Sequence, residues 1–326
     1  MEECLVIITY IASDAQGNEL RLAIEGWRKH FKEKFRLVIV GDEPPVYNVE
    51  YMIVDRKNEK DGEYRPHLDI CNKLDYVWRM YNGDYEGFIW ASDDCFPIND
   101  FTLADVKAPK YLDDEMPSEG ENDPNPFFRN LVKTRRFCER EGLGIRNWIT
   151  HLPLWFDMEK LHRVIRDYKL TENSYVVENI YYNKYTPEGV PEKLSLNDDW
   201  KFGVYFSPFD RAGFKDALAH KKWVCCSVNG WSKTMERKLM DHYGIDLEVN
   251  EEEEAYFRGY LAGLRERLDW LDVKAIVDIA DYLLPQKAMD NNDVLARFQS
   301  EKEYYEEVLK IFKYGKEKHP RPSSRG

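Results

Sequence analysis

The chain lacks the long apolar stretch that a membrane-spanning helix requires. Its longest strand-like apolar runs, such as CLVIITY at residues 4–10, are far shorter than the roughly 20 residues that cross a bilayer. The opening residues MEECLVIITY carry acidic side chains where a secretory signal peptide has basic ones. We therefore expect a protein without a transmembrane segment, located in the cytoplasm.

Basic residues are also fewer than acidic ones. The 326 residues contain 47 Lys and Arg against 60 Asp and Glu, which gives a formal net charge of −13. An acidic chain repels nucleic-acid backbones and anionic lipid surfaces. We therefore expect no nucleic-acid partner. The excess of carboxylates is compatible with a metal-dependent site, although most of them are expected at the solvated surface.

Several sequence motifs are missing, and each absence excludes a class of protein. The six cysteines form no C-x-x-C pair, so no zinc site is indicated and we expect free thiols in a reducing compartment. The chain has no G-x-x-x-x-G-K-[ST] and no G-x-G-x-x-G after its first strand. P-loop nucleotide binding and dinucleotide binding are therefore disfavoured. The nucleophile-elbow motif G-x-S-x-G and the motif H-E-x-x-H are absent too.

What the first hundred residues do contain is an alternation of strands and helices. Short β-rich apolar runs alternate with stretches whose apolar residues recur at helical spacing. Such alternation predicts an α/β fold with a mainly parallel central sheet flanked by helices. The expected strands cover 4–10, 35–41, 51–55 and 88–94, and the expected helices cover 20–31 and 67–83.

In the remainder of the chain, the pattern changes near residue 250 from mixed strands and helices to helices alone. Before that point we expect a helix at 127–141, another after residue 157 and a last strand within 221–230, while 176–186 fits either a strand or a helix. We predict one transferase-like domain over 1–250 and a helical extension over 251–316, followed by a disordered tail over 317–326. The apolar faces of the extension are expected to pack on the first domain or to mediate self-association.

The strongest chemical signal is FIWASDDCFPI, in which an apolar strand ends at Asp93 and Asp94. Ligands of parallel sheets bind at the carboxyl ends of the strands. Two carboxylates together with phosphate oxygens suit Mg²⁺ or Mn²⁺, and such a cation neutralises a departing diphosphate. The alternative is that the two acids merely form a turn. We favour a metal and diphosphate site.

The opening strand, the helix after it and the acidic pair that closes a later strand resemble the GT-A glycosyltransferases over about residues 1–100. That resemblance implies a GT-A-like sheet and a nucleotide base held near the end of the first strand. Thr9, Tyr10 and Asp55 are the corresponding residues here. Arg56 and Lys73 are further candidates for contact with the nucleotide-sugar.

Blocks over about residues 17–232 also resemble, in the same order, the Stealth proteins, which transfer a sugar-1-phosphate and include capsule enzymes and the animal N-acetylglucosamine-1-phosphotransferase. NELRLAIEGWRKHF, FIWASDDCFPI, THLPLWFDMEKLHRVI and KKWVCCSVNGWSKTM carry this resemblance. It implies Asp93 and Asp94 as metal or catalytic carboxylates, His151 as a catalytic imidazole and Asn229 as a site residue. The chain departs from the family in lacking its opening block and in having Asn229-Gly230 where the family has Asn-Asp.

Three weaker signals complete the candidates. Asp199, in SLNDDWKFG, is either a second catalytic acid or a turn residue. Arg135, Arg136 and Arg140 lie on the expected helix at 127–141, where they either form a solvated face or hold a phosphorylated acceptor. His151 is bracketed by aromatic residues, and an imidazole there is either a structural group or a base that accepts a hydroxyl proton.

These signals together predict metal-dependent transfer of a sugar, or a sugar-1-phosphate, from a nucleotide-diphospho-sugar to an acceptor hydroxyl. We expect a UDP-sugar donor, a glycan or small hydroxyl-bearing acceptor, and a place in surface or capsular polysaccharide synthesis. Two alternatives remain open. One is a non-catalytic carbohydrate- or partner-binding protein on a decayed scaffold, which the Asn229-Gly230 departure favours. The other is a nucleotidyltransferase.

Overall fold

The computed structural model describes residues 3–46, 49–57, 66–123, 125–194, 201–202, 211–226 and 230–245. Nearly all of these residues belong to the compact unit Met1–Gly244. The predicted extension over 251–316 and the tail over 317–326 lie outside the described residues. They stay predictions, as does the boundary at residue 250.

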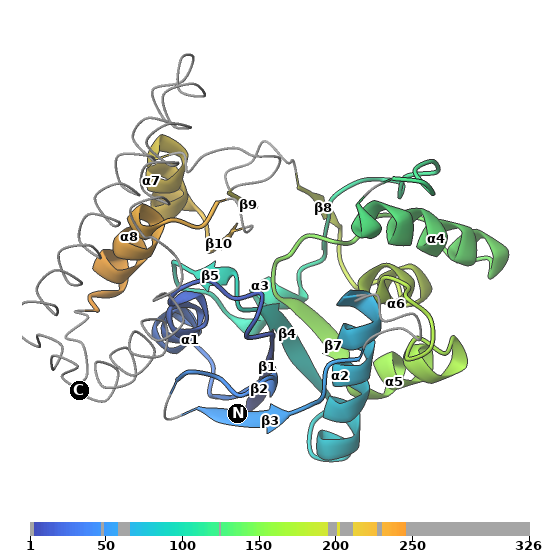
Figure 1. The fold of residues 1–326 in the computed structure, drawn as a ribbon, viewed down its shortest axis with the longest axis horizontal. Helices are drawn as coiled ribbons and strands as arrows, with labels where there is room; N and C mark the ends of the chain where they lie inside the picture. Colours follow the sequence, from blue (N-terminus) through green and yellow to red (C-terminus); the bar gives the residue numbers. More distant parts are fainter. Residues whose placement is uncertain are drawn as a thin grey trace, which may run out of the picture. The chain divides into compact units, whose positions relative to one another are not determined.

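A five-stranded sheet in the order β3-β2-β1-β4-β7 forms the centre of this unit. The first four strands along the chain pair in parallel, and only β7 runs antiparallel, against β4. Figure 1 shows this sheet between the helices. The predicted mainly parallel α/β fold is therefore confirmed. The strands are β1 (Cys4–Tyr10), β2 (Phe35–Gly41), β3 (Glu50–Ile53), β4 (Gly87–Ser92) and β7 (Leu154–Asp157).

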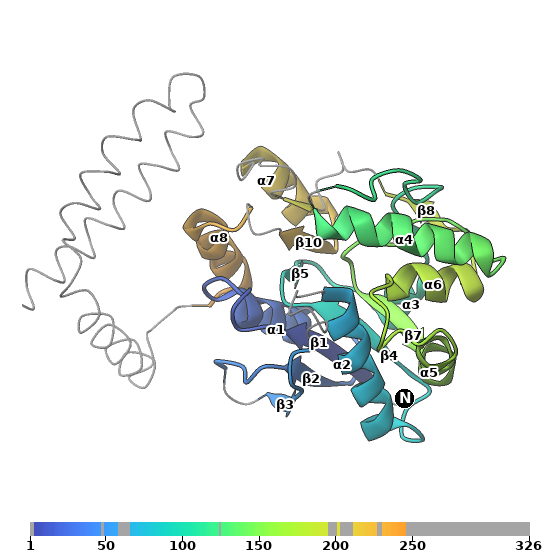
Figure 2. The same cartoon turned by 45° about the vertical axis from the view of Figure 1, so that its right-hand side comes forward.

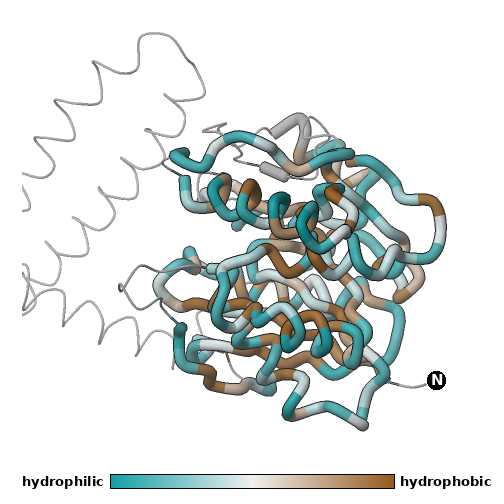
Figure 3. Tube along the Cα trace, turned by 90° about the vertical axis from the view of Figure 1, so that its right-hand side faces the viewer, coloured by the Kyte–Doolittle hydropathy of each residue, from teal (hydrophilic) through white to brown (hydrophobic). Residues whose placement is uncertain are grey.

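Each face of the sheet builds a separate apolar core, because successive side chains of a strand point to opposite faces. Val6 and Ile8 of β1 pack with residues of α1 (Glu19–His30), whereas Leu5 and Ile7 join the core that α2 (Pro66–Tyr81) covers. Figures 1 and 2 show α1 on one side of the sheet and α2 on the other. Figure 3 shows the apolar segments gathered inside. Burial on both faces explains why β1 reads as a continuous apolar run.

The helices after β4 complete the second face. α5 (Met158–Asp167) packs with α2, and both α4 (Pro126–Arg140) and α6 (Val177–Lys184) contribute to the same core. The segment 176–186, which fitted either type of element, is thus a helix from Val177 to Lys184. Asn125 begins α4 by accepting a hydrogen bond from the Phe127 backbone N–H at 3.0 Å, the usual role of an N-cap.

A small second sheet continues from the first. It has the order β5-β10-β9, formed by β5 (Cys95–Pro97), β10 (Trp223–Cys226) and β9 (Lys201–Phe202). β5 follows β4 after only two residues, so the chain passes from the main sheet into the small one at that turn. Short β6 (Lys110–Tyr111) and β8 (Glu192–Lys193) pair with each other.

Three more helices complete the described elements. They are α3 (Leu103–Lys107), α7 (Arg211–His220) and α8 (Lys233–Tyr243). α8 lies beside α1, and its last residue, Tyr243, donates a hydrogen bond of 2.7 Å to the Pro97 carbonyl at the end of β5. No helix within the described ranges is both long and apolar enough to cross a bilayer. The six cysteines, all within the described residues, form no disulfide, and all but Cys4 are buried.

Candidate active site at the carboxyl edge of the sheet

The candidate site lies where the parallel strands end. Tyr10 is paired with Gly41 at the ends of β1 and β2, and Thr9 is paired with Ser92 at the end of β4. Asp93 and Asp94 come directly after Ser92. The acidic pair therefore occupies the edge at which sheets of this kind bind their ligands.

Asp93 and Asp94 form the two-residue turn between β4 and β5. The expected strand over 88–94 therefore ends at Ser92, because the backbone reverses at the two acids. The Ser92 hydroxyl donates a hydrogen bond to the Asp94 carboxylate, and the Cys226 backbone N–H donates one to the Asp94 carbonyl at 2.9 Å. Both sheets thus fix the position of this turn, and the side chains of both acids are only partly exposed.

The carboxylates here repel one another. Burial, followed by the charge of Asp94, raises the pKa of Asp93 to about 7, while the nearby Lys73 ammonium acts in the opposite direction. Burial also raises the pKa of Glu19 to about 8, and the charges of Asp93, Asp94 and Glu236 add to that effect. A group of acids kept close together and partly out of water is costly unless protons or cations compensate.

Glu19 is a member of this acidic group that the sequence reasoning missed. It begins α1, and its carboxylate accepts a hydrogen bond from the Gln16 backbone N–H at 2.7 Å. Glu236 comes from α8 and accepts a hydrogen bond of 2.6 Å from the Asn18 side chain. Nothing in the sequence links residue 236 to residue 19, but Glu19 could have been suspected from its place directly after the loop that follows the first strand.

Lys73 supplies positive charge beside the acids. Its ammonium lies 2.7 Å from the Asp69 carboxylate, one helical turn earlier, and both side chains are almost completely buried. The same ammonium donates a 3.3 Å hydrogen bond to the Tyr10 carbonyl at the end of β1. Lys73 therefore connects α2 to the carboxyl edge of the sheet. Asp69 was not among the predicted site residues.

The other residues predicted to contact the nucleotide-sugar lie near the end of β1. The Thr9 hydroxyl accepts a 3.3 Å hydrogen bond from the Trp90 indole. The Tyr10 side chain is buried in the core beneath α1. Asp55 and Arg56 are exposed, and the Arg56 guanidinium donates to the Ser13 hydroxyl at 3.0 Å in the loop that follows β1.

His151 reaches the same edge from another part of the chain. It precedes β7, whose first residue is paired with Trp90 near the end of β4, and its carbonyl accepts a 3.0 Å hydrogen bond from the Cys225 thiol. Cys225 is paired with Cys95, the residue after Asp94. The imidazole is exposed, and the backbone at His151 has a φ of 58°. That left-handed conformation costs a residue other than glycine roughly 1 kcal/mol or more and is concentrated at functional sites.

Asp199 and Asn229 lie outside the described residues. The end of β10 at Cys226, three residues before Asn229, is adjacent to Asp94 through the Cys226 N–H.

The donor set at Asp93 and Asp94 is suited to a hard divalent cation. Within the described part of the chain, no three His, Cys, Asp or Glu side chains are arranged to hold a metal by themselves. Mg²⁺ and Mn²⁺ at nucleotide sites take one or two carboxylates and complete their shell with phosphate oxygens and water. Two adjacent, partly buried acids fit that pattern, because a cation would offset both the burial and the repulsion by Asp94 that raise the pKa of Asp93.

Comparison of the chain with protein-family models gives no match, and comparison with curated protein sequences gives none either.

The raised pKa values predict a particular dependence of stability on pH in the absence of divalent cations. An unfolded Asp or Glu titrates near about 4, so the stabilisation from protonated Asp93 and Glu19 is complete below that pH. It is lost as the pH rises through about 7 for Asp93 and about 8 for Glu19. Each group contributes a slope of at most about 1.4 kcal/mol per pH unit. In urea unfolding with EDTA, Asp93→Asn should lose less stability than the unaltered chain between pH 6 and pH 8. If the free energy of unfolding of the two chains changes with pH in the same way, Asp93 does not titrate in this range.

Proposed function

We propose that the chain is a metal-dependent transferase that moves a sugar, or a sugar-1-phosphate, from a nucleotide-diphospho-sugar to an acceptor hydroxyl. The observation that carries this proposal is the partly buried Asp93–Asp94 pair at the carboxyl edge of a parallel sheet. The resemblance of the sequence to GT-A glycosyltransferases and to Stealth proteins gives further support.

The acidic edge and the diphosphate have charges of the same sign, so this site needs a counter-charge to bind its donor. Asp93 and Asp94 would hold the cation, which neutralises the negative charge on the departing phosphate when bound. Lys73 stabilises the charged form of Asp93, because its ammonium lowers the pKa of that carboxyl. Positioning and charge neutralisation would then supply most of the rate enhancement.

His151 is the residue that we assign to the acceptor. Its side chain is exposed and its backbone is joined to β10 beside the acidic turn. An imidazole can accept the proton of the acceptor hydroxyl near neutral pH. The segment with Asp199 provides the alternative base that the sequence predicts.

Two reactions share this arrangement and differ in the bond that breaks. In glycosyl transfer the acceptor oxygen bonds to the anomeric carbon, the bond from that carbon to the phosphate oxygen breaks, and UDP leaves. In sugar-1-phosphate transfer the acceptor oxygen bonds to the β-phosphorus, the bond from that phosphorus to the bridging oxygen breaks, and UMP leaves. The base takes the acceptor proton in both reactions.

The test is to incubate the full chain with Mn²⁺, a panel of UDP-sugars and mixed sugar acceptors, and to measure the released nucleotide. We expect release that EDTA abolishes: UDP identifies glycosyl transfer and UMP identifies sugar-1-phosphate transfer. His151→Ala should slow release by about 10²–10⁴-fold, the usual contribution of a general base. Absence of release from every donor would contradict the transferase. Pyrophosphate release from a nucleoside triphosphate would instead identify a nucleotidyltransferase.

A further inference from the structure

Two cysteines face each other across the small sheet. Cys95 is the first residue of β5, Cys225 is the third residue of β10, and the two are direct partners in the antiparallel ladder. Both side chains are completely buried and belong to the same apolar core. Two thiols at opposed positions of one ladder are a pair between which a disulfide can form, provided that the backbone separation is suitable.

The hydrogen bonds of the ladder identify the type of this pair. The Cys226 backbone N–H donates to the Asp94 carbonyl at 2.9 Å, so these two residues form a hydrogen-bonded pair. Hydrogen-bonded and non-hydrogen-bonded pairs alternate along an antiparallel ladder. Cys95 and Cys225, one step further on, therefore form a non-hydrogen-bonded pair. Pro97 lies in the next pair of the same type, where its missing N–H removes no ladder hydrogen bond.

This type of pair has the backbone separation that a disulfide requires. Opposed residues of a non-hydrogen-bonded pair have their Cα atoms about 4.5 Å apart and their side chains close together on one face of the sheet. A disulfide joins residues whose Cα atoms are about 4.4–6.8 Å apart. Cys95 and Cys225 therefore meet this requirement at the short end of the range, without a large movement of either strand.

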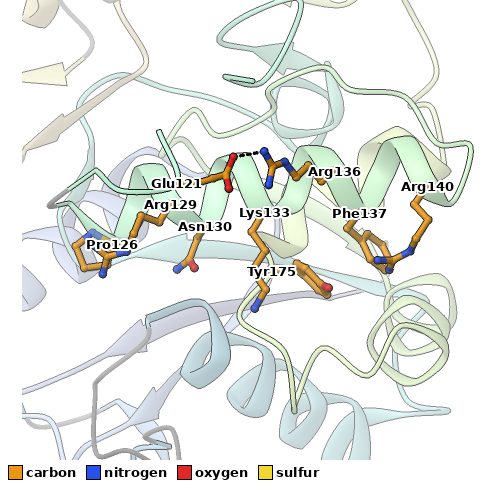
Figure 4. Close-up of a pocket in the computed structure, with 9 residues that line it drawn as sticks. All are labelled: Glu121, Pro126, Arg129, Asn130, Lys133, Arg136, Phe137, Arg140 and Tyr175. Carbon is orange, nitrogen blue, oxygen red and sulfur yellow. Dashed lines mark hydrogen bonds and ion pairs between the residues drawn. The ribbon is translucent and has the colours of Figure 1, made fainter. Parts of the chain in front are cut away.

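The other four cysteines are placed differently. Cys226 follows Cys225 in the same strand, so its side chain points to the opposite face. Cys71 and Cys138 belong to the core on the other face of the main sheet. Cys138 lies on α4, the helix whose pocket is shown in Figure 4. Cys4 begins β1, at the opposite edge of the main sheet from the turn that leads into β5. The fold therefore favours the pairing of Cys225 with the cysteine of β5.

The pair borders the candidate active site. Cys95 directly follows Asp94, and the Cys225 thiol donates a 3.0 Å hydrogen bond to the His151 carbonyl. Oxidation of Cys225 to a disulfide would remove the hydrogen of this bond and would join β5 to β10 covalently beside the acidic turn. The redox state of the pair would therefore act on the segments that position Asp94 and His151.

Exchange at these thiols requires the small sheet to open, because both thiols are buried and the reacting species is an accessible thiolate. β5 is only three residues long, and it shares three residue pairs with β10. Local opening of a short ladder costs less free energy than unfolding of the whole domain. We therefore expect slow exchange in the folded chain rather than none.

We propose that Cys95 and Cys225 form a reversible disulfide across the small sheet when the chain reacts with a low-molecular-weight disulfide such as glutathione disulfide. One cysteine thiolate attacks a glutathione sulfur, the glutathione S–S bond breaks, and a mixed disulfide forms as one glutathione thiolate leaves. The second cysteine thiolate attacks the protein sulfur of the mixed disulfide and displaces the other glutathione. The two cysteines lose two electrons, glutathione disulfide gains them, and the two thiol protons end on the two released glutathione molecules.

The test is to incubate the full folded chain with reduced and oxidised glutathione, quench with acid, alkylate the remaining thiols, and map linked peptides by mass spectrometry without reduction. We expect a chain that has lost two hydrogen atoms and in which Cys95 is linked to Cys225. This link should be about tenfold or more as abundant as any other, because the ladder fixes the separation that a disulfide requires. Dithiothreitol should return the chain to its original mass.

Matched variants distinguish the two adjacent cysteines of β10. Cys226→Ser should form the link like the unaltered chain, whereas Cys225→Ser should not. Fragmentation of the linked peptides from the unaltered chain locates the bonded sulfur independently, so the result does not depend on the folding of a variant. An oxidised chain without an intramolecular link, a link from Cys95 mainly to another cysteine, or a link that persists in Cys225→Ser would overturn the proposal. None of these results depends on the transferase chemistry.

Discussion

Replacing Lys73 by methionine is expected to remove about 3–5 kcal/mol of unfolding free energy. That is a large part of the roughly 5–15 kcal/mol that stabilises a folded domain. The reason is burial: 2% of the Lys73 side chain and none of the Asp69 side chain is exposed, and the two charges lie 2.7 Å apart. Lys73→Met leaves the Asp69 carboxylate buried without its counter-charge. Urea unfolding monitored by circular dichroism measures the loss.

A double variant separates this electrostatic effect from a loss of packing. Lys73→Met combined with Asp69→Asn removes both charges and keeps an oxygen that can accept from the Lys57 backbone N–H, as Asp69 does at 2.7 Å. We expect this variant to recover most of the lost stability, since replacing both members of a buried pair is often nearly neutral. Arg28→Met is the matched control, because Arg28 forms an exposed pair with Glu25, and such pairs contribute about 0–1 kcal/mol. A double variant no more stable than Lys73→Met would refute the electrostatic explanation.

The second large effect concerns Asp94→Asn. We expect this change to abolish the stabilisation of the chain by Mn²⁺ together with UDP while leaving the fold intact. The Ser92 hydroxyl can still donate to the amide oxygen, and the Cys226 N–H still donates to the carbonyl of residue 94, so the turn keeps its hydrogen bonds. What is lost is one of two carboxylates that would hold the cation, and the diphosphate would then face an acidic edge without sufficient counter-charge. Thermal melting measures the difference.

The expected size of that difference follows from binding linkage. A ligand at 100 times its Kd stabilises the folded state by about 2.7 kcal/mol, which in a domain of this size raises Tm by roughly 5–10 °C. Asp84→Asn is the matched control, because Asp84 is exposed and lies just before β4, at the opposite end of the strand from Asp94. The control should retain the full rise. If Asp94→Asn shows the full rise in Tm, Asp94 does not hold the metal.

Periodicity was sufficient for most of the fold. The run CLVIITY and the helical spacing after it predicted β1 and α1, because burial on both faces of a parallel sheet and on one side of a helix leaves a clear pattern. β5 and β7 were not predicted. They are only three and four residues long, and a short apolar run beside a helix has no periodicity of its own.

Site residues that lie in one segment of the chain could be predicted from the sequence. Contacts between residues from distant segments could not. Asp93 and Asp94 stand out because they follow an apolar strand. Glu19 and Glu236 are 217 residues apart, and Glu236 comes close to Glu19 only because α1 and α8 pack together. Lys73 was suspected from its place on α2, but its partner Asp69 was not, since a buried i, i+4 pair looks like a surface pair in sequence.

The central claim is that the acidic turn binds a divalent cation only together with a nucleoside diphosphate, and one melting experiment on the unaltered chain tests it most directly. Tm would be measured near pH 7.5 with Mn²⁺ alone, UDP alone, and both. We predict that both together raise Tm by several degrees more than the two separate shifts combined. Shifts that merely add, or no shift with any addition, would contradict the claim.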